Sequence, residues 1–300
     1  MLDVLIIGSG PAGLSAAVYA KRASLRTVVL EKVYYSTGQI AQSSQVDNYL
    51  GLVGIGGYEL GTKFREHAEK LGVEFQDGEA DGFEAIEGGW RVLLKGKEPI
   101  ETKTVIYAAG ATHRHLAVPG EEALEGCGVS YCATCDGAFF KGKKVAVIGG
   151  GDTAMDDALY LSELCETVYL IHRRSEFRGM ADTLSRIQEK ENIKLVTNAQ
   201  IASVQGEGRV TGVVLKDGQE ISVDGVFIAV GMQPQTAAVK EVVHLDDHGY
   251  IVADETGITD AKGFFVAGDV RTKVLRQVVT AVSDGANAAF SAGEYLRKVH

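Results

Sequence analysis

An internal repeat constrains the fold of this chain more than any other feature of its sequence. Residues 2–32 read LDVLIIGSGPAGLSAAVYAKRASLRTVVLEK, and residues 143–173 read KKVAVIGGGDTAMDDALYLSELCETVYLIHR. Each copy has a β-branched run, a glycine-rich turn, an amphipathic stretch and a second β-branched run. This order predicts a βαβ unit, whose crossover helix requires parallel strands. The sequence therefore predicts an α/β fold with two parallel sheets.

The glycines in the two turns predict that each unit binds a dinucleotide. The first turn holds Gly8, Gly10 and Gly13, and the second holds Gly149 and Gly151, with Ala154 in the third place. In such a turn the first glycine allows a tight bend, the second lets the backbone approach a pyrophosphate, and the third lets the helix pack closely on the strand. Amide groups at the helix N-terminus then bind the anion. One such turn is weak evidence, but two in register, each after a predicted strand and before a predicted helix, are strong evidence.

The end of the second strand differs between the copies and indicates different ligands. Glu31 ends the first unit, where a carboxylate accepts hydrogen bonds from both hydroxyl groups of an adenosine ribose. His172 holds the matching place in the second unit, and it is followed by Arg173, Arg174 and, after a turn, Arg178. Guanidinium groups bind a 2′-phosphate through charge-assisted hydrogen bonds, whereas a carboxylate repels it. The first unit therefore suits FAD or NAD and the second suits NADPH; a solvated strand end is the alternative interpretation of the arginines.

Length and charge limit the classes of protein to which this chain can belong. Its 300 residues suggest two domains, and its 45% hydrophobic and 23% charged residues are typical of a globular protein. Thirty basic against forty acidic residues give a net charge of −10, which argues against a nucleic-acid partner. The N-terminus lacks the basic and apolar regions of a secretory signal, and no apolar run is long enough to span a membrane. We therefore expect a soluble, cytoplasmic protein that binds neither nucleic acid nor membranes.

A CxxC motif supplies the chemistry that the nucleotide units lack. Four cysteines are too few for a disulfide framework in a chain of this size, but Cys132 and Cys135 are spaced for redox chemistry. A CxxC motif near a helix start has a lowered thiol pKa, and its second cysteine resolves a mixed disulfide. The adjacent Asp136 is placed to deliver a proton to a leaving thiolate. The alternatives are inert cysteines or a zinc site, which needs four ligands and finds its nearest other candidates in Cys127, His113 and His115.

The C-terminal part of the sequence indicates that the first domain is discontinuous. Residues 263–269 predict a strand that ends in an exposed acid, Asp269. Arg276 and Gln277 follow, before a helix of small residues over 281–292. A carboxylate at a strand's C-terminal edge can accept hydrogen bonds from ribityl hydroxyls, and helix N-terminal amides can face the flavin pyrimidine. We therefore expect an FAD-binding domain over 1–114 and 242–300, with an NADPH-binding domain over 115–241 inserted into it.

Turn-forming residues suggest where the chain crosses between these domains. Residues 119–122 (PGEE) and 246–249 (DDHG) carry turn signals and are the expected crossings. Short alternating runs between 75 and 106 predict a β-meander packed on the first domain, with Trp90 as a packing residue.

Taken together, these motifs closely resemble low-molecular-weight, bacterial-type NADPH-dependent thioredoxin reductases. The resemblance rests on GSGPAG, the acid Glu31, CATCDG, GGGDTA, HRRSEFR and AGDV with RQ, and it covers essentially the whole chain. CATCDG is the most specific of these motifs, since the others are shared more widely among flavoproteins that bind two dinucleotides. The resemblance implies two Rossmann-like, three-layer ββα domains, with the NADPH domain inserted into the FAD domain. It also implies a homodimer.

The resemblance and the glycine motifs together define the expected site residues. The catalytic residues are Cys132, Cys135 and Asp136, and no metal is expected. The FAD contacts expected are Gly8, Gly10, Pro11, Ala12, Gly13, Glu31, Lys32, Gly38, Gln39, Asn48, Ala109, Gly110, Gly268, Asp269, Arg276, Gln277 and Val278. The NADPH contacts expected are Gly149, Gly151, Asp152, Thr153, His172, Arg173, Arg174 and Arg178.

The resemblance further implies an order of electron transfer. NADPH reduces FAD, FAD reduces the Cys132–Cys135 disulfide, and the dithiol reduces oxidised thioredoxin, with a domain rotation between the half-reactions. By position, Cys135 is the flavin-side thiol, Cys132 attacks thioredoxin and Asp136 is the acid–base partner. Phe139 and Phe140 resemble the loop aromatics that receive thioredoxin, with core packing as the alternative.

Some residues depart from the family's pattern or have no part in it. Thr37, Leu50, His113 and His115 stand where other residues are commoner, and both histidines are expected to be solvated loop residues. Cys127 has no family role, and Cys165 is expected to be buried on the apolar side of the second unit's helix.

Three other functions are compatible with the same fold. Reduced ferredoxin or a reduced flavin could be the electron donor, although GGGDTA and HRRSEFR are both complete here. The protein partner could resemble glutaredoxin or be linked to a peroxiredoxin. A non-enzymatic redox sensor would equilibrate its disulfide once with NADPH and would not turn over.

Overall fold

The computed structural model describes residues 1–43 and 45–299, and these form two compact units. Unit 1 comprises residues 1–112 and 233–300, and unit 2 comprises residues 113–232. The first crossing lies close to the expected boundary at 114. The second lies earlier than the expected boundary at 241, because Val239 and Val243 are buried in a core cluster of unit 1.

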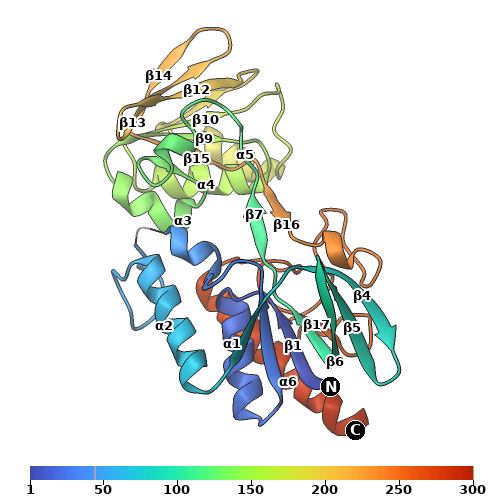
Figure 1. The fold of residues 1–300 in the computed structure, drawn as a ribbon. Helices are drawn as coiled ribbons and strands as arrows, with labels where there is room; N and C mark the ends of the chain where they lie inside the picture. The colour runs from blue at the N-terminus through green and yellow to red at the C-terminus, as the bar shows by residue number, and fades with distance from the viewer. Residues whose placement is uncertain (44, 300) are drawn as a thin grey trace. The chain divides into compact units, whose positions relative to one another are not determined.

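Unit 1 is built on a seven-stranded sheet (Figure 1). Its strands are β1 (Leu2–Ile7), β2 (Thr27–Glu31), β3 (Glu74–Asp77), β4 (Ala80–Ile86), β5 (Gly89–Leu94), β6 (Lys97–Tyr107) and β17 (Phe264–Val266). The order is β3-β2-β1-β6-β5-β4, and β17 pairs in parallel with the C-terminal end of β6. β1 pairs in parallel with β2 and β6, as the repeat predicts, whereas β4, β5 and β6 pair antiparallel as the expected meander.

The alternating side chains of β1 separate the two faces of this sheet. Val4 and Ile6 pack against the helices α1 (Pro11–Arg22), α2 (Gly57–Lys70) and α6 (Val278–Val299). Leu5 and Ile7 face the opposite cluster, to which β5 contributes Trp90. Trp90 is 7% exposed and its indole N–H donates to the carbonyl of Lys262, so its expected packing role is confirmed. Unit 1 thus has the predicted layers of helix, parallel sheet and β-meander (Figure 1).

Unit 2 repeats this layering with shorter elements (Figure 1). Its parallel sheet has the order β11-β10-β9-β15-β8. These strands are β8 (Val129–Ser130), β9 (Lys144–Ile148), β10 (Thr167–Ile171), β11 (Ile193–Val196) and β15 (Gly225–Ile228). Val145 and Val147 face α4 (Asp152–Ser162) and α5 (Ala181–Gln188), whereas Ala146 and Ile148 face an antiparallel sheet. That sheet consists of β12 (Ile201–Gly206), β13 (Val210–Leu215) and β14 (Glu220–Ser222).

The two segments expected to be domain crossings lie inside the units, so that prediction is wrong. The chain crosses at β7 (Ala111–His113) and β16 (Met232–Pro234), which pair with each other. Residues 119–122 belong to unit 2, where Glu121 is only 1% exposed and accepts hydrogen bonds from the backbone of Leu116 and Val118. Residues 246–249 form a turn within unit 1, closed by the Asp246 side chain.

Candidate redox site and dinucleotide sites

Two glycines of the first turn are required by the packing of the protein itself. Gly8 has φ +107°, and a Cβ atom there would lie 2.5 Å from the carbonyl oxygen of Ala108. A Cβ at Gly13 would lie 1.9 Å from the carbonyl oxygen of Gly8. These glycines therefore allow the turn after β1 and the close contact of α1 with that turn. Gly149 does the same in unit 2, where its Cβ would lie 2.4 Å from the carbonyl oxygen of Ala229.

Packing within the protein does not require a glycine at the middle position of either turn. Gly10 and Gly151 have extended backbone angles that any residue adopts, with φ −73° and −99°. A Cβ at Gly10 would come no closer than 3.8 Å to another atom, and at Gly151 it would meet nothing within 4 Å. Each glycine precedes the first residue of a helix, Pro11 in α1 and Asp152 in α4. The open space at these helix N-termini fits the approach of a pyrophosphate to backbone amides.

The fold of unit 1 brings separate predicted FAD contacts to the first turn. Gly38 begins the short helix η1 (Gly38–Gln42), and a Cβ there would lie 3.0 Å from the Cα of Gly10. A Cβ at Gly268 would lie 2.8 Å from the Cβ of Ala12. Ala109 also lies at this turn, because its Cα would be 3.4 Å from a Cβ at Gly8. Residues from four parts of the sequence thus surround one backbone turn.

A second pair of predicted contacts meets at the start of α6. The side-chain amide of Asn48 donates a hydrogen bond to Oε1 of Gln277 over 3.0 Å. Gln277 directly precedes Val278, the first residue of α6, and the guanidinium of Arg276 lies 4.1 Å from the ring centroid of Tyr250. Asn48 and Gln39 are exposed. Of the other FAD contacts expected, Lys32 is exposed and pairs with Glu79.

Glu31 is held by an arginine that the sequence did not reveal. Its carboxylate is 2% exposed and accepts two hydrogen bonds from Arg65 of α2, over 2.6 Å and 3.2 Å. The Arg65 guanidinium also lies 3.2 Å from the ring centroid of Phe75. Burial alone lowers the pKa of this guanidinium, but the hydrogen bonds with Glu31 and Glu69 raise it overall. The buried carboxylate is therefore charge-balanced and fixed in orientation at the end of β2.

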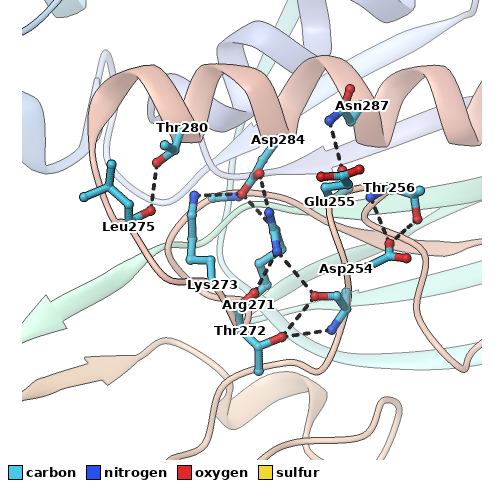
Figure 2. Close-up of polar contacts among 12 residues, drawn as sticks. Asp254, Glu255, Thr256, Arg271, Thr272, Lys273, Leu275, Thr280, Asp284 and Asn287 are labelled. Atoms are coloured by element: carbon cyan, nitrogen blue, oxygen red, sulfur yellow. Dashed lines mark hydrogen bonds and ion pairs between the residues drawn. The ribbon is translucent and has the colours of Figure 1, made fainter.

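A buried ionic cluster of Arg271, Lys273 and Asp284 joins α6 to the loop that follows β17 (Figure 2). Asp284 of α6 accepts hydrogen bonds from the backbone of Gly268, from Arg271 and from Lys273, all within 3.0 Å. The Lys273 ammonium also lies 3.7 Å from Oδ1 of Asp269. Burial raises the pKa of Asp269, and the charge of Lys273 opposes that rise. The cluster fixes the conformation of the loop that carries Asp269 and leads to Arg276 and Gln277.

In unit 2 the three predicted arginines are exposed at the end of β10. Arg173, Arg174 and Arg178 form no ion pair and donate no side-chain hydrogen bond within residues 1–43 and 45–299. Two hydrogen bonds join the loop that carries Arg178 to the glycine turn and the start of α4. The Arg178 amide donates to the carbonyl of Gly150 over 2.7 Å, and Asp152 accepts from the Met180 amide over 2.8 Å. The arginines are therefore available for an anionic ligand at this turn.

His172 is buried and packs against the turn at Gly150. It is 5% exposed, and its ring would lie 2.1 Å from a Cβ at Gly150, which leaves no room for a larger residue there. The ring stacks on Phe177 at 5.1 Å between centroids. Burial lowers the pKa of His172, as do the charges of the nearby arginines. The imidazole thus packs against the turn and fills the space beside Gly150. Thr153 follows Asp152 in the first turn of α4 and is exposed.

The unsatisfied polar atoms of the molecule coincide with the predicted dinucleotide contacts. In the described part of the chain, three buried side-chain atoms lack a hydrogen-bond partner: Nε2 of His172, Oδ1 of Asp269 and Nε of Arg276. Buried polar atoms are rarely left without a partner unless a ligand or water supplies one. All three residues were predicted from sequence to contact FAD or NADPH. The residues present therefore fit two dinucleotides, one in each unit.

The CxxC motif is in its oxidised form at the start of a short helix in unit 2. Cys132 and Cys135 form a disulfide, with their Cα atoms 5.3 Å apart. Cys132 precedes the first residue of α3 (Ala133–Asp136), which ends at Asp136. Oδ2 of Asp136 accepts a hydrogen bond from Ser130 over 2.6 Å. Burial raises the pKa of Asp136, and the Ser130 hydroxyl opposes that rise. Among the described residues, no group of three or more acidic, histidine or cysteine side chains is arranged to hold a metal ion.

Several expectations for residues around this motif are corrected or refined. Phe140 is 9% exposed and packs against Phe227 at 5.3 Å, so it is a core residue, whereas Phe139 is 41% exposed. His113 is not a solvated loop residue: its ring stacks on Tyr131, and burial lowers its pKa to about 4. Cys165 is buried as expected, which raises its pKa to about 11.

Comparison with known proteins places the chain in a family. A model of the pyridine nucleotide-disulphide oxidoreductase family matches residues 2–285. A thioredoxin reductase of Mycolicibacterium smegmatis is 42% identical and covers 98% of this chain and 96% of its own length. That of Bacillus subtilis is 40% identical, covering 99% of this chain and 95% of its own length.

Solved structures give the same result. The thioredoxin reductase of Streptococcus pyogenes is 40% identical, covers 99% of both chains and superposes with a TM-score of 0.94. The thioredoxin reductase of Lactococcus lactis, described as being in the FR conformation, is 38% identical over 100% of both chains, with a TM-score of 0.69. Two dinucleotide turns and a redox disulfide in one chain, matched along nearly its whole length, mean that this chain is an oxidoreductase and belongs to the pyridine nucleotide-disulphide oxidoreductase family.

Proposed function

We propose that this enzyme passes electrons from NADPH through FAD and the Cys132–Cys135 disulfide to oxidised thioredoxin. The observation that carries the proposal is the position of the disulfide. It lies in the same unit as a glycine turn with three exposed arginines, in a chain with a second dinucleotide turn. Thioredoxin reductases of the family contain FAD and use NADPH, and this chain has one unit for each.

The carboxylate and the arginines support the assignment of one cofactor to each unit. Glu31 in unit 1 and the arginines in unit 2 stand at equivalent ends of a second strand. Glu31 would bind the ribose of FAD, and Asp269, whose Oδ1 has no hydrogen-bond partner among the described residues, would bind the ribityl chain. Arg173, Arg174 and Arg178 would bind the 2′-phosphate of NADPH. The second unit therefore selects NADPH over NADH.

Cys135, Cys132 and Asp136 carry the thiol chemistry. FAD bound in unit 1 would supply the two electrons that open the disulfide. The S–S bond breaks, and the carboxylic acid of Asp136 gives its proton to one of the two thiolates. Cys135 is the thiol on the flavin side, and the Cys132 thiolate attacks the disulfide of thioredoxin. Cys135 then displaces the reduced partner from the mixed disulfide, which restores the Cys132–Cys135 bond.

A rotation between the two units would alternate the partners of the flavin. The solved enzymes from S. pyogenes and L. lactis have nearly the same sequence identity to this chain, 40% and 38%. Their TM-scores against it nevertheless differ, at 0.94 and 0.69. They therefore differ from each other in overall arrangement. β7 and β16 are the two crossings about which such a rotation would occur. Homodimerisation and a cytoplasmic location are part of the proposal; among the described residues, no helix is long and apolar enough to cross a membrane.

Replacing Cys135 by serine separates the two halves of this electron path. In Cys135→Ser, NADPH should still bleach the flavin, because that step does not involve the disulfide. Reduction of thioredoxin should be lost, since Cys132 alone cannot release the mixed disulfide. Cys127→Ser, at an exposed free cysteine of the same unit, is the matched control and should keep full turnover. Sustained reduction of thioredoxin by the Cys135→Ser enzyme would contradict the proposed role.

A further inference from the structure

A buried hydroxyl group joins the strand before the CxxC motif to the acid that follows it. Ser130 ends β8 and is 6% exposed. Its Oγ donates a hydrogen bond to Oδ2 of Asp136 over 2.6 Å and accepts one from the Cys132 amide over 3.1 Å. The carbonyl oxygen of Cys132 lies farther away, at 3.4 Å from the same Oγ. One side chain thus contacts both ends of the segment that contains the disulfide.

The two contacts of Ser130 give its proton a defined direction. A hydroxyl group has one proton and two lone pairs. Because the Cys132 amide occupies a lone pair, the proton is directed to the shorter contact, the carboxylate of Asp136. A hydrogen bond donated to a carboxylate stabilises its charged form and fixes its orientation. The hydroxyl therefore opposes the burial that favours the neutral acid.

The surroundings of Asp136 single out Ser130 as its partner. The elements packed around the CxxC turn also carry Tyr131, Lys141, Asp157 and Tyr160. Within the part of the chain that the structure describes, none of these four forms a hydrogen bond or ion pair with Asp136. Tyr131 instead donates to Glu121 over 2.9 Å. Among these described neighbours, the neutral Ser130 hydroxyl is therefore the group that donates a hydrogen bond to the Asp136 carboxyl group and opposes the effect of its burial.

We infer that Ser130 is a positioning residue, which holds the Asp136 carboxyl group for proton transfer to a cysteine thiolate and sets the pH range in which that transfer works. This inference rests on the proposed acid role of Asp136. When two electrons open the disulfide, the proton moves from the carboxyl oxygen to sulfur, and the carboxylate that remains keeps the Ser130 hydrogen bond. Solvent then reprotonates the carboxylate. Ser130 gains and loses no proton in this cycle.

The test is the pH profile of NADPH-dependent thioredoxin reduction by the holoenzyme. A general acid must be protonated, so turnover should fall on the alkaline side as Asp136 ionises. Ser130→Ala removes a hydrogen bond from the carboxylate form, so this limb should move to higher pH by about one unit. Ser130→Thr keeps the hydroxyl and should restore the original limb. Ser162→Ala removes another buried serine hydroxyl of unit 2, which donates to the backbone of Leu159, and should leave the profile unchanged.

Asp136→Asn distinguishes failure of this inference from failure of the proposed function. In that variant turnover should be strongly reduced, and the pH profile of the remaining turnover should lack the alkaline limb. Adding Ser130→Ala to it should change neither the remaining turnover nor its pH profile. If Asp136→Asn abolishes the limb but Ser130→Ala leaves it in place, the role of Ser130 is overturned and the acid role stands. If Asp136→Asn keeps the wild-type profile, the acid role itself is wrong. Should Ser130→Ala not retain flavin, Ser130→Gly removes the same hydroxyl group.

Discussion

At the scale of single residues, we propose that Arg173 and Arg174 determine which nicotinamide nucleotide unit 2 accepts. Both are exposed, and neither has a carboxylate partner within residues 1–43 and 45–299. A ligand with a 2′-phosphate gains two charge-assisted contacts from these guanidinium groups, whereas a ligand with a free 2′-hydroxyl gains none. If the proposal is right, selectivity at this site is electrostatic, and the binding of NADPH and of NADH should respond differently to removal of the charges.

Arg173→Ala combined with Arg174→Ala should weaken NADPH binding by roughly a hundredfold, since each lost charged hydrogen bond costs about 1.5 kcal/mol or more. NADH binding should change by less than about threefold, because it lacks the phosphate. Titration of flavin reduction with each nucleotide measures both values. Arg209→Ala, at an exposed arginine of the β12–β13 turn in the same unit, is the control. Equal loss for the two nucleotides would refute the phosphate assignment.

Local motifs made many of the site residues predictable, and tertiary contacts hid the rest. Cys132, Cys135 and Asp136 are adjacent in sequence, and the turn glycines are required by backbone geometry that a motif records. Arg65 could not be found in this way, because it reaches Glu31 only after α2 packs beside β2. The packing of the His172 ring against Gly150 is a tertiary contact of the same kind, which no sequence motif records.

The helix α4 carries, at the scale of one element, a half-buried acid whose ionisation affects stability. Asp157 lies on this helix, and burial together with the neighbouring Asp156 raises its pKa from 3.8 to about 7. Between these two values the folded protein binds more protons than the unfolded chain. Stability should therefore fall as pH rises through this window, and the loss is complete above pH 7 or so.

Asp157→Asn should stabilise the enzyme at pH values above the raised pKa, because asparagine carries no charge to desolvate. The gain should be on the order of 2 kcal/mol at alkaline pH and should vanish in acid below the ordinary pKa of an aspartate. Thermal denaturation across that range measures the difference between variant and wild type. Asp182→Asn, at an exposed position of α5, should shift the melting temperature by a similar small amount at every pH. A pH-independent effect of Asp157→Asn would show that Asp157 ionises normally.

Elements with strong periodicity were predictable, whereas their connections were not. The two βαβ units follow from their apolar runs and glycine turns, and both sheets have the predicted parallel pairing. The crossings were misplaced because PGEE and DDHG look like linkers, while the true crossings are short strands without turn signals. Glu121 explains the error: its buried carboxylate ties the backbone around it to Tyr131, which sequence composition does not reveal.

The whole molecule keeps its two nucleotide sites in separate units. The predicted FAD contacts belong to unit 1, whereas the three arginines and the redox disulfide belong to unit 2. In the proposed function, unit 2 therefore carries both the binding site for NADPH, which reduces the flavin, and the disulfide that the flavin reduces. NADPH and the disulfide would therefore exchange electrons with the same flavin in a fixed order: NADPH reduces FAD, and FAD then reduces the disulfide.

Anaerobic absorbance of the protein-bound flavin tests that order most directly. NADPH, and in a separate sample NADH, is added to the oxidised enzyme, followed by an oxidised thioredoxin. We predict bleaching by a low concentration of NADPH, weak bleaching by NADH, and return of the oxidised flavin spectrum when thioredoxin is added. If NADPH leaves the flavin oxidised while dithionite bleaches it, the arginines do not serve NADPH, and an electron donor of the ferredoxin or reduced-flavin type takes its place.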